Sequence, residues 1–155
     1  MTHGADELQS LPSAEIRALE ALMTGVPIYA TLGFREVTFR PGVCRAIVPR
    51  RTEYDGIFQT FHGGLLMTAA DSAAALAVLT LAGAIAKITT TDMSIRFLAP
   101  ALTDVVVEAR VIKFGRTLVP LQVDLRSMDA KLVAIAQVTY MRLERITSRG
   151  AAVAL

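Results

Sequence analysis

The chain has 155 residues, 53% of them hydrophobic and 19% charged, which fits one globular domain and excludes a disordered chain. Lys and Arg total 16 against 14 for Asp and Glu, and no basic run is interleaved with aromatic residues, so nucleic acid is not an expected partner. The hydrophobic fraction is high for a monomer, and the excess predicts a buried subunit interface.

The single cysteine, Cys44, excludes an intrachain disulfide, and residues 1–11 contain Asp6 and Glu7 instead of an apolar signal segment. Together these features predict a cytoplasmic protein. The longest apolar stretch, 65–82, approaches the length of a membrane span, but Asp71 lies near its middle. Because a charge is costly in lipid, no membrane partner is expected.

The predicted elements begin with a helix from about 13 to 23, for which Pro27 is a stop signal. Two short β-favouring runs around Pro41-Gly42 predict a hairpin, and a polar loop follows. The segment 63–82 is rich in alanine and apolar nearly all round, which indicates a buried helix. Downstream, the pattern favours four strands, at 87–98, 105–114, 121–126 and 132–143.

This order of elements predicts an α+β fold in which an antiparallel sheet of about six strands wraps around one long helix, because a helix that is apolar on all sides must be covered. We expect a single domain over residues 13–143, between a flexible N-terminal segment, 1–12, and a C-terminal tail, 144–155.

Gly63 and Gly64 stand at the predicted start of the buried helix. Glycine lets a ligand approach the backbone closely, the first-turn N–H groups lack intrahelical acceptors, and the helix dipole adds positive potential. This arrangement suits a carbonyl oxygen that gains negative charge. A tight turn from loop to helix would use the same two residues, so the glycines alone leave both interpretations open.

Asp71 lies two turns into an otherwise apolar helix, where an unpaired carboxylate is costly. It is therefore a candidate base or nucleophile, the alternative being a structural carboxylate bonded to the backbone or to Ser72. His62 could cap the helix, orient the loop or touch a substrate. No metal-ligand cluster, Ser-His-Asp spacing or phosphate-binding loop is present in the sequence, so neither a metal nor a cofactor is expected.

Residues 62–71, HGGLLMTAAD, resemble the HGG(x)6D signature of the PaaI-like hotdog-fold acyl-CoA thioesterases. Two downstream segments are also similar to that family: 91–100, TDMSIRFLAP, resembles a strand of the family, and 113–116, KFGR, resembles its hairpin turn. The similarity runs from about Leu32 to Arg142 in the same order of elements. The resemblance implies a hotdog fold and hydrolysis of an acyl-CoA to the free acid and CoA.

The resemblance also implies a homodimer, paired into a dimer of dimers, in which two sheets join edge to edge and each active site lies at the interface. By the family's motif, the Gly63 amide beside Gly64 would polarise the thioester carbonyl. Asp71 of the other subunit would attack that carbonyl or activate water, and His62 would help to hold the acyl group. Thr89 is predicted to supply the hydroxyl that positions the water.

Arg116 at the Gly115 turn, together with Arg96 and Lys113, is predicted to meet the phosphates of CoA. The acyl group would lie against an apolar wall that suits medium-chain or aryl groups. The predicted wall consists of Phe58, Phe61, Leu65, Leu66 and Met67.

One position departs from the family pattern. Many relatives carry Asn or Gln six residues before the motif histidine, whereas this chain has Gly56 there, and Gln59 of the same loop is predicted to substitute. Gly56 therefore favours one alternative function, a non-catalytic acyl-CoA-binding module on the same fold. Hydration or dehydration of an acyl thioester is less favoured, because the motifs of those hotdog branches are not found, and a purely assembling protein would leave Asp71 unexplained.

Overall fold

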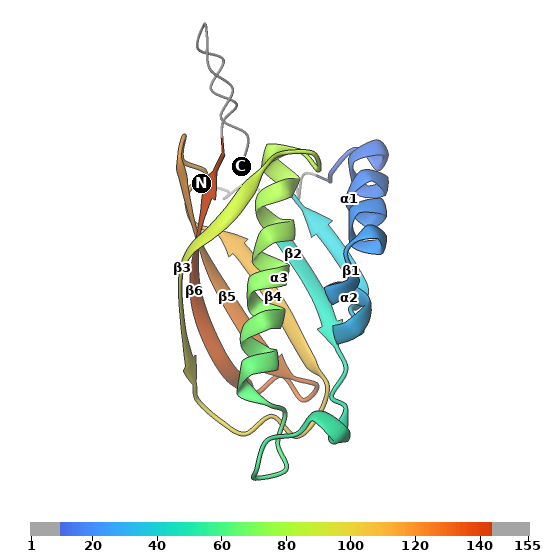
Figure 1. Ribbon diagram of the computed structural model, residues 1–155, viewed down its shortest axis with the longest axis vertical. Helices are drawn as coiled ribbons and strands as arrows, with labels where there is room; N and C mark the ends of the chain where they lie inside the picture. The colour runs from blue at the N-terminus through green and yellow to red at the C-terminus, as the bar shows by residue number, and fades with distance from the viewer. Residues whose placement is uncertain (1–9, 144–155) are drawn as a thin grey trace, which may run out of the picture.

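The computed structural model describes residues 10–143, which form one antiparallel sheet curled around a long helix (Figure 1). The predicted tail, 144–155, lies outside the described residues, as does most of the predicted N-terminal segment, 1–12. The helices are α1 (Ser13–Gly25), α2 (Pro27–Leu32) and α3 (Gly63–Ala82), with a short 3-10 turn, η1 (Thr52–Tyr54). The strands are β1 (Arg35–Arg40), β2 (Val43–Val48), β3 (Ile88–Phe97), β4 (Val105–Val111), β5 (Leu118–Ser127) and β6 (Leu132–Arg142).

The sheet has the strand order β1-β2-β4-β5-β6-β3, so β1 and β3 are its two edges. The predicted hairpin around Pro41-Gly42 joins β1 to β2, and the four predicted downstream strands are β3 to β6. The short helix α2 was not predicted. Pro27, a stop signal for the preceding helix in the sequence pattern, occupies the first turn of α2, where its missing N–H would have no helical acceptor in any case.

Helix α3 forms the centre of the core and lies against the concave face of the sheet (Figure 1). Most of its residues are buried, and the alanines among them let the helix approach the strands closely. Its length and apolar composition would also suit a membrane span, but here it is the core helix of the fold. Helices α1 and α2 lie beside α3 over β1 and β2, and Leu19 anchors α1 in the core.

The two faces of the sheet have different chemistry. In β5, the buried residues Val119, Leu121, Val123 and Leu125 face α3, and the half-buried residues between them face outward. No described helix covers the outer face (Figure 1). Gly63, Gly64 and Asp71, three candidate residues of the sequence, all lie on α3, inside this curled sheet.

Candidate active site

The N-terminus of α3 leaves one backbone donor without an acceptor. The N–H of Gly64 donates to the Nδ1 atom of His62 at 2.9 Å, and the N–H groups of Leu65 and Leu66 both donate to the His62 carbonyl. Within residues 10–143, the N–H of Gly63 has no hydrogen-bond acceptor. Since a helix start also carries positive potential, this N–H is the group best placed to bind a carbonyl oxygen that gains negative charge.

His62 is the N-cap of α3, so one of the three roles that the sequence allowed is observed. Its Nδ1 atom accepts a hydrogen bond, which means that the neutral ring carries its proton on Nε2. His62 is exposed, and this N–H donor faces away from the helix end that Nδ1 caps. The side chain can therefore fix the helix start and still offer one donor to a ligand.

A hollow of about 350 Å³ lies beside the free N–H of Gly63. An ideal Cβ at Gly63 would lie 3.0 Å from the ring of Phe97, so the two residues are in close contact and a larger residue at 63 would push the ring aside by a few tenths of an ångström. Apart from Thr60, the lining side chains are apolar and none is charged, and polar atoms as well as carbon face the hollow. The lining residues are Thr60, Phe61, Gly63, Leu66, Phe97, Leu98, Ala99, Pro100 and Ala101.

The hollow contains only part of the apolar wall that the sequence predicted. Phe61 and Leu66 line it, whereas Phe58 lies at a loop tip and is 83% exposed. The strand end at Phe97 and Leu98 supplies walls that were not predicted. The hollow is large enough for an apolar acyl group, since a cavity of about 150 Å³ already holds a benzene ring.

Asp71 is half-buried in the middle of α3 and accepts two side-chain hydrogen bonds on the same oxygen, Oδ1. The hydroxyl of Thr90 in β3 donates at 2.9 Å, and the hydroxyl of Tyr140 in β6 lies 2.8 Å away. The Tyr140 hydroxyl is also 3.0 Å from the backbone carbonyl of Asp71. Ser72, which the sequence offered as a structural partner, does not bond the carboxylate. The other carboxylate oxygen, Oδ2, has no donor within residues 10–143.

A β-bulge decides which threonine of β3 reaches Asp71. Met93 pairs with the buried Val138 and faces α3, so a strict two-residue alternation would turn Thr91 and Thr89 inward. The register shifts between Thr90 and Asp92, which leaves one extra residue and reverses the alternation. As a result Thr90 lies opposite Tyr140 and faces Asp71, while Thr89 pairs with Met141. The hydroxyl beside the carboxylate is that of Thr90, and the proposed role of Thr89 stays a prediction.

Gly56 and Gln59 lie in the tight loop between η1 and α3. The N–H of Gly56 donates to the Thr60 carbonyl, and the Gly56 carbonyl accepts from the N–H of Gln59, both at 2.9 Å. Gln59 adopts a positive φ of 55°, and its backbone carbonyl accepts a hydrogen bond from Arg50. The exposed Gln59 side chain makes no hydrogen bond within residues 10–143, so it remains available to a ligand.

The predicted CoA-binding cations do not lie beside Asp71 or Gly63 within one chain. Lys113, Gly115 and Arg116 form the β4–β5 turn, at the end of the molecule away from the start of α3 (Figure 1). Arg96 is exposed on the outer face of β3, where it lines a different hollow with Ser94 and Gln122.

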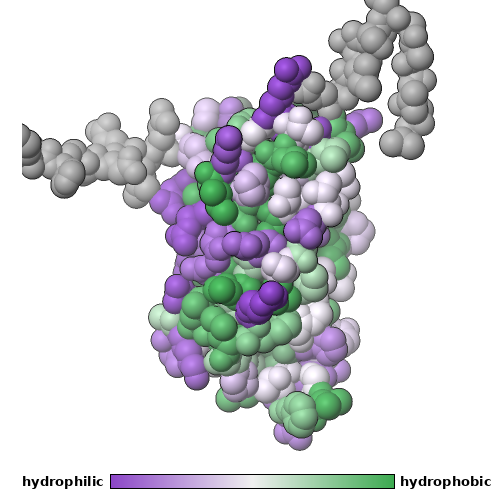
Figure 2. All heavy atoms as spheres, turned by 90° about the vertical axis from the view of Figure 1, so that its left-hand side faces the viewer, coloured by the Kyte–Doolittle hydropathy of each residue, from purple (hydrophilic) through white to green (hydrophobic). Residues whose placement is uncertain are grey.

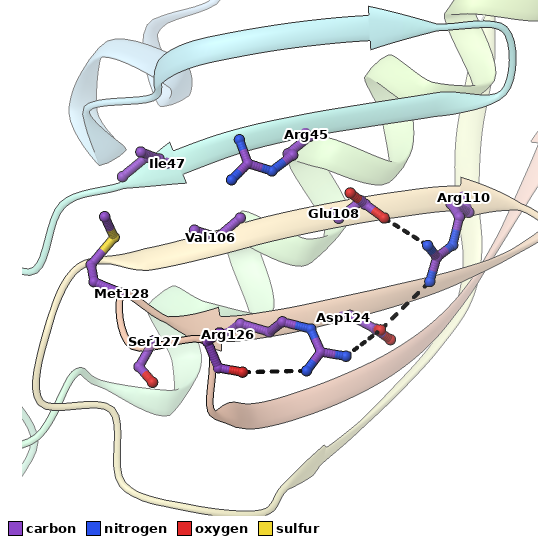
Figure 3. Close-up of a pocket in the computed structure, with 10 residues that line it drawn as sticks. Arg45, Ile47, Val106, Glu108, Arg110, Asp124, Arg126, Ser127 and Met128 are labelled. Atoms are coloured by element: carbon purple, nitrogen blue, oxygen red, sulfur yellow. Dashed lines mark hydrogen bonds and ion pairs between the residues drawn. The ribbon is translucent and has the colours of Figure 1, made fainter. Parts of the chain in front are cut away.

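A further hollow, of about 330 Å³, lies on the outer face over β2, β4 and β5 (Figure 3). Its charges largely compensate one another: Arg110 binds Glu108 at 2.7 Å and Asp124 at 3.5 Å, and Arg126 binds Asp124 at 3.2 Å. It lies on the side of the sheet opposite α3, so it does not share a cavity with Asp71. The candidate active site is therefore the inner one, around α3.

Comparisons with known proteins bear on the family and the fold of this chain. A family model described as the thioesterase superfamily matches residues 58–134, about half of the chain. A solved thioesterase family protein from Silicibacter pomeroyi is 27% identical, with a TM-score of 0.77 over 83% of this chain and 98% of its own. The PaaI protein from the phenylacetic acid degradation operon of E. coli is 20% identical, with a TM-score of 0.79 over 87% of this chain and 97% of its own. A Saccharolobus solfataricus protein whose name proposes an esterase is 27% identical over 123 residues, 78% of this chain and 87% of its own.

The matched residues include the HGG motif, Asp71 and Thr90. The likeness to PaaI concerns the fold alone at this identity, and it confirms that the sheet around α3 is the hotdog fold that the motif resemblance implied. The family match supports hydrolysis of a small-molecule thioester in general, and an oligomeric state. The chain belongs to the thioesterase superfamily.

Proposed function

We propose that this protein hydrolyses an acyl-CoA thioester to the free acid and CoA. The observation that carries the proposal is the Asp71 carboxylate, which is half-buried in the core helix. Both of its side-chain hydrogen bonds are on Oδ1, so Oδ2 remains available for chemistry. The free N–H of Gly63 complements it, because ester-type chemistry needs a donor for the carbonyl oxygen. The reaction needs no cofactor, since CoA is part of the substrate.

The two groups cannot act together within one chain. Gly63 and Asp71 are separated by eight positions of α3, which corresponds to about 12 Å along the helix axis at the usual rise per residue. A single thioester carbonyl cannot be in contact with both. We therefore assign each active site to two chains, with the Gly63 N–H from one protomer and the Asp71 carboxylate from its partner.

A two-fold axis would meet this requirement in a simple way. If two copies of α3 run antiparallel, Asp71 of each faces Gly63 of the other when the axis passes near the midpoint, Met67. Met67 is a large apolar side chain that is 36% exposed, as expected for a residue that a partner covers. The arrangement makes two equivalent sites in a homodimer, and a dimer of dimers would preserve both of them.

The free edge of β3 is the proposed contact between the two sheets. Ten residues long, β3 pairs on one side only, and a long unpaired edge is normally covered by another chain. Figure 2 looks onto this edge and shows apolar atoms gathered in the lower half of the face. Phe97 and Leu98, at the end of β3, are more than half exposed. Apolar surface of this kind favours a second protomer as the partner.

The proposed reaction follows from these positions. The Gly63 N–H binds the thioester oxygen, and the Nε2–H of His62 helps to hold the acyl group. Asp71 then either takes a proton from a water molecule that adds to the carbonyl carbon, or adds to that carbon itself. The C–S bond breaks, CoA leaves as the thiolate and is protonated, and the acid is released directly or after water cleaves the acyl-aspartyl intermediate.

The Asp71→Asn variant tests this function. We expect it to fold normally and to lose about 100-fold or more in kcat, because the amide can neither accept the proton nor form the acyl intermediate efficiently. The measurement is release of free CoA thiol from a panel of short-chain, medium-chain and aryl acyl-CoAs. Equal kcat/KM values for the variant and the wild type across the whole panel would rule out a catalytic Asp71.

Gly56 supports one alternative, a non-catalytic acyl-CoA-binding module, because the side-chain amide of the family's Asn or Gln is missing there. The two functions make different predictions for the wild-type protein. A binding module gives heat of binding with acyl-CoA in calorimetry but no thiol release above the uncatalysed rate, whereas the proposed enzyme gives both.

A further inference from the structure

Tyr140 is the least expected member of the candidate site. It lies in β6, 69 positions after Asp71 in the chain, and only 4% of the residue is exposed. Its hydroxyl reaches Oδ1 of Asp71 at 2.8 Å, and its cross-strand neighbour Thr90 reaches the same oxygen at 2.9 Å. Two strands therefore converge on one carboxylate oxygen from the inner face of the sheet.

Tyr140 keeps its proton at working pH, so its hydroxyl always has one hydrogen to donate. Burial raises the pKa of Tyr140 far above its usual range; a hydrogen bond with Thr90 opposes this effect, and the nearby Asp71 carboxylate adds to it. A tyrosine that stays protonated offers its single O–H to an acceptor, and the charged carboxylate is the strongest acceptor within reach. The Tyr140–Asp71 contact is therefore a charge-assisted hydrogen bond in a part-buried position.

The contact has a directional consequence for Asp71. With both donors on Oδ1, rotation of the carboxylate would break two hydrogen bonds, so the side chain is held in one orientation. Oδ2 is then the oxygen without a donor within residues 10–143. A carboxylate that is already held in one orientation does not have to rotate before it reacts. Orientation of the reacting groups is a large part of the rate acceleration that an active site provides.

We infer that Tyr140 is a positioning residue for the reaction, which holds Asp71 through Oδ1 and leaves Oδ2 as the reacting oxygen. The inference rests on the proposed function, in which Asp71 is the base or nucleophile. Tyr140 itself touches no substrate in this scheme and acts entirely through Asp71. Its hydroxyl therefore affects the chemical step and leaves the binding of the acyl-CoA unchanged.

The chain offers a matched control for this inference. Tyr29, in α2, is also buried, and its hydroxyl donates to the same stretch of α3, but to the backbone carbonyl of Ser72 at 3.2 Å. Tyr29→Phe and Tyr140→Phe thus each remove one buried hydroxyl from a ring next to Asp71. Only the second removes a donor from the carboxylate, so any general effect on packing or stability is common to both variants.

The experiment compares steady-state thiol release by the two variants with an acyl-CoA that the wild type hydrolyses. We expect Tyr140→Phe to lower kcat by about tenfold or more, as for loss of a hydrogen bond to a charged group, with KM within about twofold of wild type. We expect Tyr29→Phe to keep kcat within about twofold, even where its thermal unfolding temperature falls as far as that of Tyr140→Phe. Equal kcat values for the two variants would overturn the inference.

A double variant supplies the second readout. Because Tyr140 acts through the Asp71 carboxylate, Tyr140→Phe should have no further effect on kcat in an Asp71→Asn background, whereas a structural role would lower kcat by the same factor in both backgrounds. Independent, multiplicative losses would therefore contradict a positioning role. If Asp71→Asn itself is fully active, the proposed catalytic role of Asp71 fails, and if the wild type releases no thiol, the proposed function fails. If Asp71→Asn is inactive and Tyr140→Phe is fully active, only the role of Tyr140 fails.

Discussion

Arg50 organises the loop that leads into α3. Its guanidinium group donates to both carboxylate oxygens of Asp55, to the Gln59 carbonyl at 2.7 Å and to the Leu102 carbonyl at 2.7 Å. One side chain thus ties the start and the end of the loop to the connection between β3 and β4. Since the loop ends at His62, Arg50 helps to hold the segment that leads to the N-terminus of α3.

The Arg50–Asp55 pair predicts a pH-dependent contribution to stability. The Arg50 guanidinium, chiefly through its hydrogen bonds, lowers the pKa of Asp55 in the folded protein. The ionised carboxylate therefore stabilises the fold above the unfolded pKa of about 3.9, and this contribution is lost as the pH falls through the lower, folded value. We expect Asp55→Asn to lower the free energy of unfolding at pH 6 and to differ less from wild type at pH 3, as measured by urea denaturation.

The neighbouring acid Glu53 provides the control for that measurement. It is exposed in η1 and makes no ion pair within residues 10–143, so Glu53→Gln should unfold like the wild type at both pH values. An Asp55→Asn variant as stable as the wild type at pH 6 would show that the pair does not stabilise the loop.

Among the elements, the β4–β5 turn has the strictest steric requirement. A Cβ on Gly115 would lie 2.2 Å from the carbonyl oxygen of Leu118, so any other residue must displace the backbone. The turn is also held from outside, because Arg142 stacks on the Phe114 ring at 4.5 Å and donates to the Gly115 carbonyl at 3.2 Å. The resemblance assigned Gly115 to CoA binding, and the turn geometry gives a separate reason for glycine at this position.

Gly115→Ala is expected to lower the free energy of unfolding by about 1–3 kcal/mol, the usual range for a substitution that strains the backbone. Thermal unfolding followed by circular dichroism measures this effect. Gly25→Ala is the matched control, since no atom lies within 4 Å of its added Cβ and alanine favours the helix. A loss of stability no larger for Gly115→Ala than for Gly25→Ala would contradict the steric argument.

The elements that the sequence predicted well are those with a strong local pattern. The alanine-rich run of α3 and the alternation of β5 depend on residues close together in the chain, so their periodicity alone predicts them. The bulge in β3 has no such signal. Three consecutive threonines, 89–91, give no indication of which one lacks a pairing partner in β6. That is why Thr89 was favoured over Thr90.

Tyr140 escaped prediction for a different reason. Its role depends on the pairing of β3 with β6 and on the way both strands pass over α3, and neither can be derived from a two-residue alternation. The sequence indicated an inward-facing aromatic residue at most. By contrast, the spacing of Asp71 from the HGG motif is visible directly, so the resemblance points to the helix residues of the candidate site and to the threonine run 89–91, but not to Tyr140.

At the scale of the whole molecule, the shared-site arrangement predicts a specific proximity between two chains. If the two-fold axis passes near Met67, then a cysteine at this position faces its own copy in the partner. We expect Met67→Cys to give a covalent dimer with a short bismaleimide, seen on a denaturing gel. The Ile85→Cys variant should not, because Ile85 is 98% exposed beyond the other end of α3, far from the proposed axis.

Equal yields of cross-linked dimer from the two cysteine variants would indicate random collisions and would contradict an axis near Met67. A monomer by light scattering at micromolar concentration would contradict the shared site as a whole, since one chain alone keeps Gly63 and Asp71 about 12 Å apart along the helix axis.

The buried position of Cys44 also matters for how this protein can be studied. Cys44 is the chain's only cysteine and is fully buried in β2, and burial raises the pKa of its thiol to about 12. A thiol reagent meets neither an accessible sulfur nor a thiolate in the folded protein. The folded enzyme therefore contributes no background to colorimetric detection of liberated CoA. The same sulfur becomes reactive once the chain unfolds, so it serves as a built-in reporter that distinguishes an inactive variant from an unfolded one.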